Sequence, residues 1–175
     1  ADVYLPDSSK VSVSGIGHNG MLQEISMTWV SKRVPREYMN TIQPVIFDRA
    51  MDVLGKVAER RLRAILEKEG IPVADVSYIR ESADEGPGDD MFTMCVTVGS
   101  DDVSSARELM SGVMCSIDSD GVSVEEYLLA EADYMNGLRR ESALPYRANA
   151  AYVDRCISAF LYNSVLSSSK QIYAL

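Results

Sequence analysis

One long amphipathic stretch, from about Ile42 to Glu69, constrains the fold of this sequence more than any other feature. Its apolar residues recur at steps of three and four, which places them on one face of an α-helix: Ile46, Ala50, Val53, Leu54, Val57, Leu62, Ile65 and Leu66. Gly55 weakens the middle of this helix, Gly70 stands where a glycine commonly ends one, and Pro72 prevents its continuation. A helix with such a stripe needs a second layer to cover it.

Three segments with a period of two are expected to form that layer. Glu24–Val30 alternates apolar and polar residues, as a half-buried strand does. Val73–Glu81 and Met91–Val98 flank an acidic loop, so an antiparallel pair is predicted. The order of one strand, a long helix and two strands predicts an α+β fold. We expect a two-layer sandwich, with an antiparallel or mixed sheet and helices packed on one face.

The rest of the chain is predicted to be helical. We expect a helix over residues 103–117 after a cap signal at Ser100-Asp101, another opened by the capping box Ser123–Glu126, and a third over residues 152–161. Each has an apolar stripe at helical spacing, so each needs a surface to pack on.

Two domain assignments follow from composition. Residues 1–23 are rich in Ser, Gly, Asp and Asn and are expected to be a linker with one short strand at Val11–Val13. Residues 24–175 are expected to form a single α+β module. The first residues carry neither an initiator Met nor a signal-peptide pattern, and the last residues are apolar with no turn behind them. We therefore expect both ends to be cuts in a longer chain.

The charge of the chain argues against nucleic acid and against an anionic membrane surface as partners. Seventeen Lys and Arg face 26 Asp and Glu, for a formal net charge of −9, whereas phosphate binding depends on basic residues. The dense basic run Arg60, Arg61 and Arg63 is interleaved with Glu59 and Glu67 at (i, i+4) spacing, which favours a solvated, ion-paired helix face. No stretch has the ~18–20 apolar residues of a membrane-spanning helix.

Metal ligands are scarce in this sequence. His18 is the only histidine, and it lies in a glycine-flanked loop, whereas a catalytic zinc ion needs about three protein ligands. The sequence has no His-x-x-Glu-His, and a catalytic triad would have to rely on His18 as its base. Cys95, Cys115 and Cys156 are far apart and form no CxxC pair, so we interpret them as small core residues. We expect no metal site within this chain.

Three further patterns each have a structural explanation. Residues Gly15–Gly20 fit G-x-G-x-x-G, but a strand follows them where a dinucleotide site requires a helix. The acidic loop Ser82–Asp90 lacks the ligand spacing of an EF-hand and has the glycines and proline of an exposed hairpin turn. The pairs Glu125/Glu126 and Glu131/Asp133 are explained by helix caps and solvated faces. No catalytic or cofactor-binding residue is assigned.

Four segments give the sequence a family resemblance. These are Glu24–Val30, the long helix and turn that end at Gly70-Ile71-Pro72, the helix opening Gly121–Tyr127, and Asn149–Tyr162. Together they resemble the non-catalytic half-modules of M16 (pitrilysin–insulinase) zinc metallopeptidases, especially long bacterial members.

The resemblance implies an enzyme of repeated α+β modules around a peptide-sized chamber. One module of such an enzyme holds zinc through His-x-x-Glu-His and a downstream Glu, and no position of this chain matches them. The implied role is a chamber wall that contacts peptide substrates and packs on the catalytic module of the same parent chain. Such relatives are often exported to the cell envelope. A stand-alone protein-interaction module and a small enzyme with a carboxylate site are the alternatives.

Overall fold

The computed structural model describes residues 10–12, 22–32, 35–82, 89–143, 153, 156–157, 159–161, 166, 171 and 173–174. The chain divides into two compact units. Unit 1 comprises Ala1–Arg33 and Gly55–Ser123, and unit 2 comprises Val34–Leu54 and Val124–Leu175. The expectation of a single module over residues 24–175 stays a prediction.

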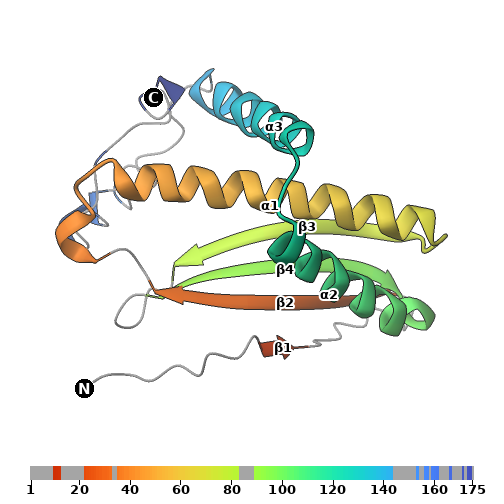
Figure 1. Cartoon of the computed structure of the whole chain (residues 1–175). Helices are drawn as coiled ribbons and strands as arrows, with labels where there is room; N and C mark the ends of the chain where they lie inside the picture. Colours follow the sequence, from red (N-terminus) through yellow and green to blue (C-terminus); the bar gives the residue numbers. More distant parts are fainter. Residues whose placement is uncertain are drawn as a thin grey trace. The chain divides into compact units, whose positions relative to one another are not determined.

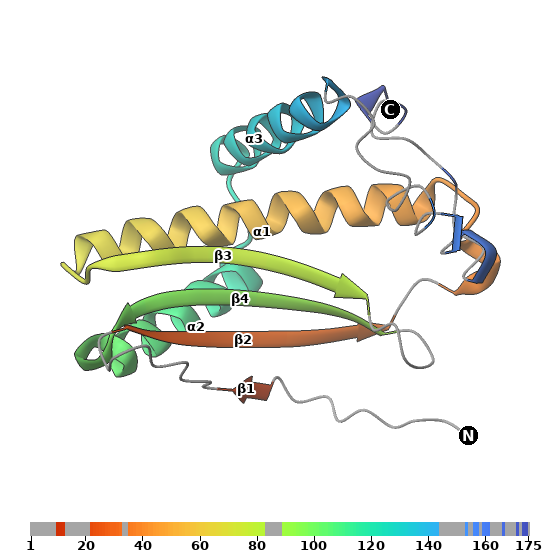
Figure 2. The same ribbon diagram turned by 180° about the vertical axis from the view of Figure 1, so that it is seen from behind.

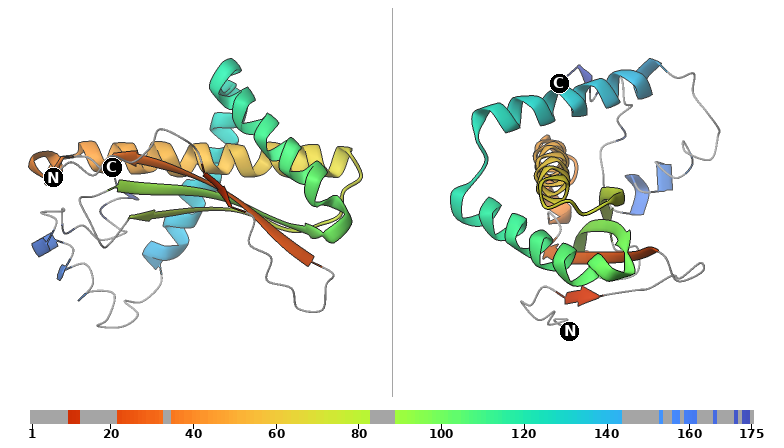
Figure 3. Two further views of the ribbon diagram at one scale, coloured as in Figure 1. Left: turned by 90° about the horizontal axis from the view of Figure 1, so that it is seen from below. Right: turned by 90° about the vertical axis from the view of Figure 1, so that its right-hand side faces the viewer.

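Unit 1 is built on a four-stranded sheet in the order β1-β2-β4-β3. Its strands are β1 (Lys10–Ser12), β2 (Leu22–Lys32), β3 (Val73–Ser82) and β4 (Asp89–Gly99). All their pairings are antiparallel, and β2, β4 and β3 lie side by side (Figure 1). The strands are twisted relative to one another, as in most sheets (Figure 3). The three strands predicted between residues 24 and 98 are thus confirmed, and each is longer than predicted. The short strand predicted at Val11–Val13 lies one residue earlier, at Lys10–Ser12.

The register of the sheet separates an apolar face from a polar one. Ile25 pairs with Val96 and Met27 pairs with Met94, and all four side chains are buried. Thr28 pairs with Thr93 on the opposite face, where their hydroxyls are 2.9 Å apart in a hydrogen bond. The alternation of apolar and polar residues that predicted half-buried strands therefore separates a buried face of the sheet from a polar face.

Two helices cover the apolar face. α1 (Gln43–Lys68) contributes its second half to unit 1, and α2 (Val103–Asp120) follows the 3₁₀ turn η2 (Ser100–Asp102). One buried cluster joins both helices to the sheet: Ile25, Met27, Ala58, Leu62, Leu66, Ile71, Val76, Met94, Val96, Val98, Ala106, Met110 and Val113. Helices on one face of an antiparallel sheet make a two-layer α+β sandwich, so the predicted fold class is confirmed.

The end of α1 is fixed by a Schellman motif. The Ile71 N–H donates to the Leu66 carbonyl at 2.9 Å, and the Gly70 N–H donates to the Glu67 carbonyl at 3.1 Å. Gly70 has a φ of 73°, which favours glycine because it has no Cβ. Leu66 and Ile71 are both buried beside this turn. The helix stop predicted at Gly70 is confirmed.

The start of α2 at Val103 agrees with the prediction, but its cap does not. β4 continues to Gly99, and Ser100–Asp102 then form a 3₁₀ turn, so Ser100 and Asp101 precede the helix without capping it. The N-cap is Asp102, whose side chain makes no capping hydrogen bond. The cap signal was therefore wrong in position, because the strand and the turn use the residues that were expected to open the helix.

Unit 2 contains the 3₁₀ turn η1 (Arg36–Tyr38), the first half of α1, and α3 (Val124–Ala143). α3 begins directly after Ser123, where the capping box predicts a helix start. Arg49 of α1 pairs with Glu131 of α3 at 2.6 Å. Of the third predicted helix, residues 153, 156–157 and 159–161 are described, and these are helical. Nowhere in the described part of the chain does a helix have the length and hydropathy needed to cross a bilayer.

Candidate functional site

Several sequence candidates lie outside the described residues. They are His18, the glycine-rich segment Gly15–Gly20 and residues 83–88 of the acidic loop. Asp89 and Asp90 of that loop are the first residues of β4, and Asp90 is buried. The acidic segment therefore ends inside the sheet rather than in a loop.

The three cysteines stand in different environments. Cys95 is buried in β4, Cys115 is exposed on α2, and Cys156 is partly exposed. Among the residues that the structure describes, no group of three or more His, Cys, Asp or Glu side chains could hold a metal ion. The described part of this chain does not fit a zinc site, and the interpretation of all three cysteines as core residues is wrong for Cys115.

The paired carboxylates of α3 have structural positions. Glu125 and Glu126 lie in the first turn of the helix, where negative charge is favoured by the helix dipole. Glu131 accepts hydrogen bonds from Arg49 at 2.6 Å and from the Tyr127 hydroxyl at 3.1 Å. These contacts stabilise unit 2, and they assign no catalytic role to the carboxylates.

The contact between α1 and β3 is unusually close at one point. α1 runs along β3, the last strand of the sheet, as Figures 1 and 2 both show. Gly55 faces the Tyr78 ring there, and an ideal Cβ at position 55 would overlap three atoms of that ring. Glycine at this position lets the helix approach the strand, because any larger residue would push the two apart.

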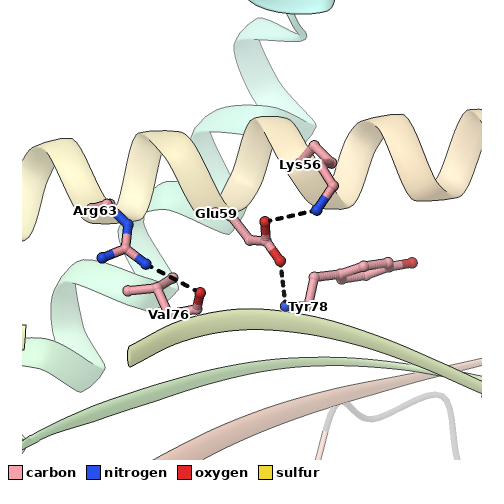
Figure 4. A network of polar contacts seen from close by, with 5 residues as sticks. All are labelled: Lys56, Glu59, Arg63, Val76 and Tyr78. Atoms are coloured by element: carbon pink, nitrogen blue, oxygen red, sulfur yellow. Dashed lines mark hydrogen bonds and ion pairs between the residues drawn. The ribbon is translucent and has the colours of Figure 1, made fainter. Parts of the chain in front are cut away.

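Three charged side chains of α1 surround this contact (Figure 4). Glu59 Oε1 accepts a hydrogen bond from the Tyr78 backbone N–H at 2.7 Å, and Lys56 Nζ lies 3.3 Å from Glu59 Oε2. Arg63 Nη2 donates to the Val76 carbonyl at 3.4 Å, which is long for such a bond. Glu59 and Arg63 thus bind the strand backbone, and the ion pair predicted between them is wrong.

Arg61 also has a structural role. It donates to the Gly121 carbonyl at 2.8 Å and to the Ser116 hydroxyl at 3.2 Å, at the C-terminal end of α2. A cation is favoured there because helix carbonyls are left without intrahelical partners. Arg61 and Arg63 therefore tie α1 to α2 and β3. Only Gly55 signalled this arrangement in the sequence, since helical periodicity does not reveal what a polar side chain contacts.

The sheet face away from α1 and α2 carries polar and acidic side chains beside the exposed apolar Val30 and Ile79; we call it the open face. It carries the Thr28–Thr93 hydrogen bond and the exposed carboxylates Glu24, Asp75 and Glu81. Cys95 lies among them, and its pKa is raised, first by burial and then by those three carboxylates. The Cys95 thiol is therefore held in its neutral, weakly nucleophilic form. Such a face favours contact with basic segments rather than nucleophilic chemistry.

Unit 2 exposes apolar side chains on helices. On α3, Val124, Leu128 and Leu129 have exposed fractions of 75%, 56% and 49%. On and beside the first turn of α1, Ile42 and Ile46 are exposed by 53% and 58%. Exposed large apolar side chains that are neighbours on one helix, as on α3, are characteristic of surfaces that pack against another protein segment.

Known proteins resemble this chain in structure. No protein-family model matches the sequence, and no curated protein matches it. The structure is similar to the periplasmic protease PqqL from Escherichia coli, with a TM-score of 0.66 and 18% identity over 89% of this chain and 17% of that one. It is also similar to a predicted insulinase family protease from Yersinia pestis, with a TM-score of 0.61 and 10% identity over 91% of this chain and 33% of that one.

A third similar structure is the ferredoxin protease FusC, solved as a mutant in complex with Arabidopsis ferredoxin. The TM-score is 0.57, with 9% identity over 93% of this chain and 17% of that one. The chain thus spans between 17% and 33% of the length of these three proteases. The chain therefore has the α+β fold of one module of the M16, insulinase-type proteases.

Proposed function

We propose that this chain is a non-catalytic module of a zinc-dependent endopeptidase that acts on peptides or unfolded polypeptides. The observation that carries the proposal is the fold, which recurs as a part of three proteases and covers at most 33% of their length. In this proposal the zinc ion and its ligands lie in another module of the same parent, which is supported by the lack of a His-x-x-Glu-His motif in this sequence.

The open face is the surface proposed to contact substrate. Its carboxylates Glu24, Asp75 and Glu81 are exposed. Polar side chains between them, such as Thr28 and Thr93, are partly exposed. Acidic groups raise the local concentration of basic segments over about one Debye length, ~8 Å at physiological salt. An unfolded polypeptide rich in Lys and Arg is the substrate class that this surface favours.

The exposed apolar residues of α3 are the surface proposed to pack on the catalytic module. Val124 and Leu128 are one helical turn apart, so their side chains share a face. Covering an exposed Leu side chain contributes about 1.5–3 kcal/mol, which makes an unpaired face of this kind a favourable docking surface.

The proposal is tested by reading the parent gene and assaying both proteins. The parent is expected to encode His-x-x-Glu-His outside this chain and to cleave fluorogenic peptides in a chelator-sensitive way. The 175-residue chain alone is expected to cleave none of them. Chelator-insensitive cleavage by the isolated chain would show that it is a small enzyme in its own right.

The docking surface is tested in the parent with Val124→Ser and Leu128→Ser. The double variant is expected to lose activity there while leaving the thermal stability of the isolated chain nearly unchanged, because both side chains are exposed. Asp133→Ser, at an exposed position on the side of the same helix away from Val124 and Leu128, is the control and should keep the activity of the wild type.

A stand-alone interaction module is the second candidate, and the same exposed apolar side chains of α3 favour it. Such a module would bind a separate protein through α3, without any protease in its parent. The two functions differ in one readily observed feature. A parent that lacks His-x-x-Glu-His and binds a protein partner through Val124 and Leu128 would support the interaction module.

A further inference from the structure

β3 is the last strand of the sheet in the order β1-β2-β4-β3. The backbone groups on the outer side of such a strand have no ladder partner, and they readily pair with an extended peptide or with a second copy of the protein. In an antiparallel ladder, both backbone groups of one residue point to the same side. The Tyr78 N–H reaches Glu59 of α1, so Tyr78 and its neighbour two residues away, Val76, present their backbone groups outward.

Two side chains of α1 meet these outward groups (Figure 4). Glu59 accepts from the Tyr78 N–H at 2.7 Å, and Arg63 donates to the Val76 carbonyl at 3.4 Å. An added strand parallel to β3 would place one of its residues beside Ser77. The carbonyl of that residue would accept from the Tyr78 N–H, and its N–H would donate to the Val76 carbonyl. Glu59 and Arg63 together occupy the hydrogen-bonding positions of that one residue.

The spacing of helix and strand makes this fit possible. Four residues of an α-helix rise about 6.0 Å, and two residues of a strand advance about 6.6 Å. Glu59 and Arg63 are four residues apart, and Tyr78 and Val76 are two apart in the opposite chain direction. A helix that runs antiparallel to the edge strand therefore brings an acceptor and a donor to two successive outward residues.

Two neighbouring residues of α1 also stabilise the contact between Glu59 and Tyr78. The missing side chain at Gly55 allows the helix to lie against the Tyr78 ring. Lys56 lies 3.3 Å from the second oxygen of Glu59, whose side chain is only 21% exposed. The charge-assisted bond to Tyr78 is stronger than a neutral one and is partly shielded from water.

We propose that Glu59 and Arg63 close the β3 edge against strand addition. A second copy of the chain, or an extended peptide, is excluded there because its hydrogen-bonding positions are already filled by α1. The closure is a property of unit 1 and does not depend on the proposed protease function. An added strand could therefore pair with this sheet only at an edge other than β3.

Opening the edge is the direct test. In the 175-residue chain, Glu59→Ala with Arg63→Ala is expected to turn a monomer into dimers or larger species. Analytical ultracentrifugation would follow this from about 1 µM to about 1 mM. Glu67→Ala, at an exposed position of the same helix, is the matched control and should stay monomeric. Glu59→Gln keeps an acceptor for the Tyr78 N–H and should also stay monomeric.

Amide hydrogen exchange at Tyr78 provides a second readout. Loss of the Glu59 bond is expected to speed this exchange by about tenfold or more in Glu59→Ala, and to leave it within about twofold in Glu59→Gln and Glu67→Ala. A double variant that stays monomeric would overturn the proposal, and so would unchanged exchange at Tyr78. If circular dichroism shows that the double variant does not fold, the single variant Glu59→Ala is used in its place. Self-association and faster exchange at Tyr78 are expected for it, and their absence would overturn the proposal.

Discussion

The Tyr78 ring lies where a side chain at Gly55 would project, so the closest approach of helix α1 to strand β3 depends on a glycine in the middle of the helix. Glycine costs a helix about 1 kcal/mol relative to alanine, and this one stands at the point of contact. The same ring stacks on Phe92 of β4, with centroids 6.5 Å apart. Gly55 therefore has a packing function that outweighs its poor helix propensity.

Replacing Gly55 with alanine is expected to destabilise the protein. Overpacking against the Tyr78 ring costs about 1–3 kcal/mol, which exceeds the gain of about 1 kcal/mol in helix propensity. Gly112 on α2 has open space around its Cα, so Gly112→Ala is the matched control and should stabilise by about 0.4–1 kcal/mol. Urea denaturation of both variants measures the difference. Equal stabilisation by both would contradict the packing role of Gly55.

Truncating Leu66 is expected to cost far more than truncating Leu128. Leu66 is fully buried in the core of unit 1, and Leu→Ala at such sites costs about 2–5 kcal/mol. Leu128 is 56% exposed, so its replacement by alanine should change the free energy of unfolding by less than about 0.5 kcal/mol. Denaturant midpoints of the two variants give the comparison, and similar losses would contradict the assigned burial.

The three cysteines are expected to react with DTNB in the order of their exposure. Cys115 is exposed, Cys156 is partly exposed, and Cys95 is buried with a raised pKa. Because the thiolate is the reactive form, Cys95 should react last at neutral pH. Single Cys→Ala variants identify each phase of the reaction. A fast phase that disappears in Cys95→Ala would show that this thiol is accessible.

The free energy of unfolding is expected to fall in alkaline solution through Cys95. Its pKa in the folded chain is raised above the ordinary 9.0, so below that pH the thiol is protonated in both states and its contribution is constant. As the pH rises further, the unfolded chain loses this proton first, and unfolding becomes more favourable until the folded thiol also ionises. Cys95→Ala should therefore lose less stability than the wild type as the pH rises above 9.0, measured by urea denaturation. Parallel losses would exclude a contribution from Cys95.

Hydrophobic periodicity was sufficient to predict the elements of unit 1 from the sequence. Period-two alternation located the strands, and the stripe ending at Gly70 located α1, because both patterns report burial on a face. The cap of α2 was misplaced, although its start at Val103 was not, because Ser100 and Asp101 are equally compatible with a helix cap and with the 3₁₀ turn that they form. Local sequence does not distinguish a helix cap from a 3₁₀ turn when the preceding strand continues past the last residue of its alternating apolar pattern.

The polar contacts of the site were not predictable in the same way. Glu59 and Arg63 have a spacing that favours an ion pair along the helix, yet both bind the backbone of β3. That choice depends on how closely the strand approaches, which is a tertiary property. Gly55 is the local sign of such an approach, although helix propensity alone predicts only that it weakens the helix.

The short connection that contains Gly70 also determines how α1 is aligned with β3. Residues 69–72 connect α1 to β3, so the length of this connection determines which backbone groups of the strand stand opposite Glu59 and Arg63. One inserted residue would advance the strand by a single position and rotate its backbone by half a turn, which would bring Ser77 in place of Tyr78 opposite Glu59. Insertions and deletions should therefore be excluded from this short connection in homologues that keep the contact, even where its residue types vary.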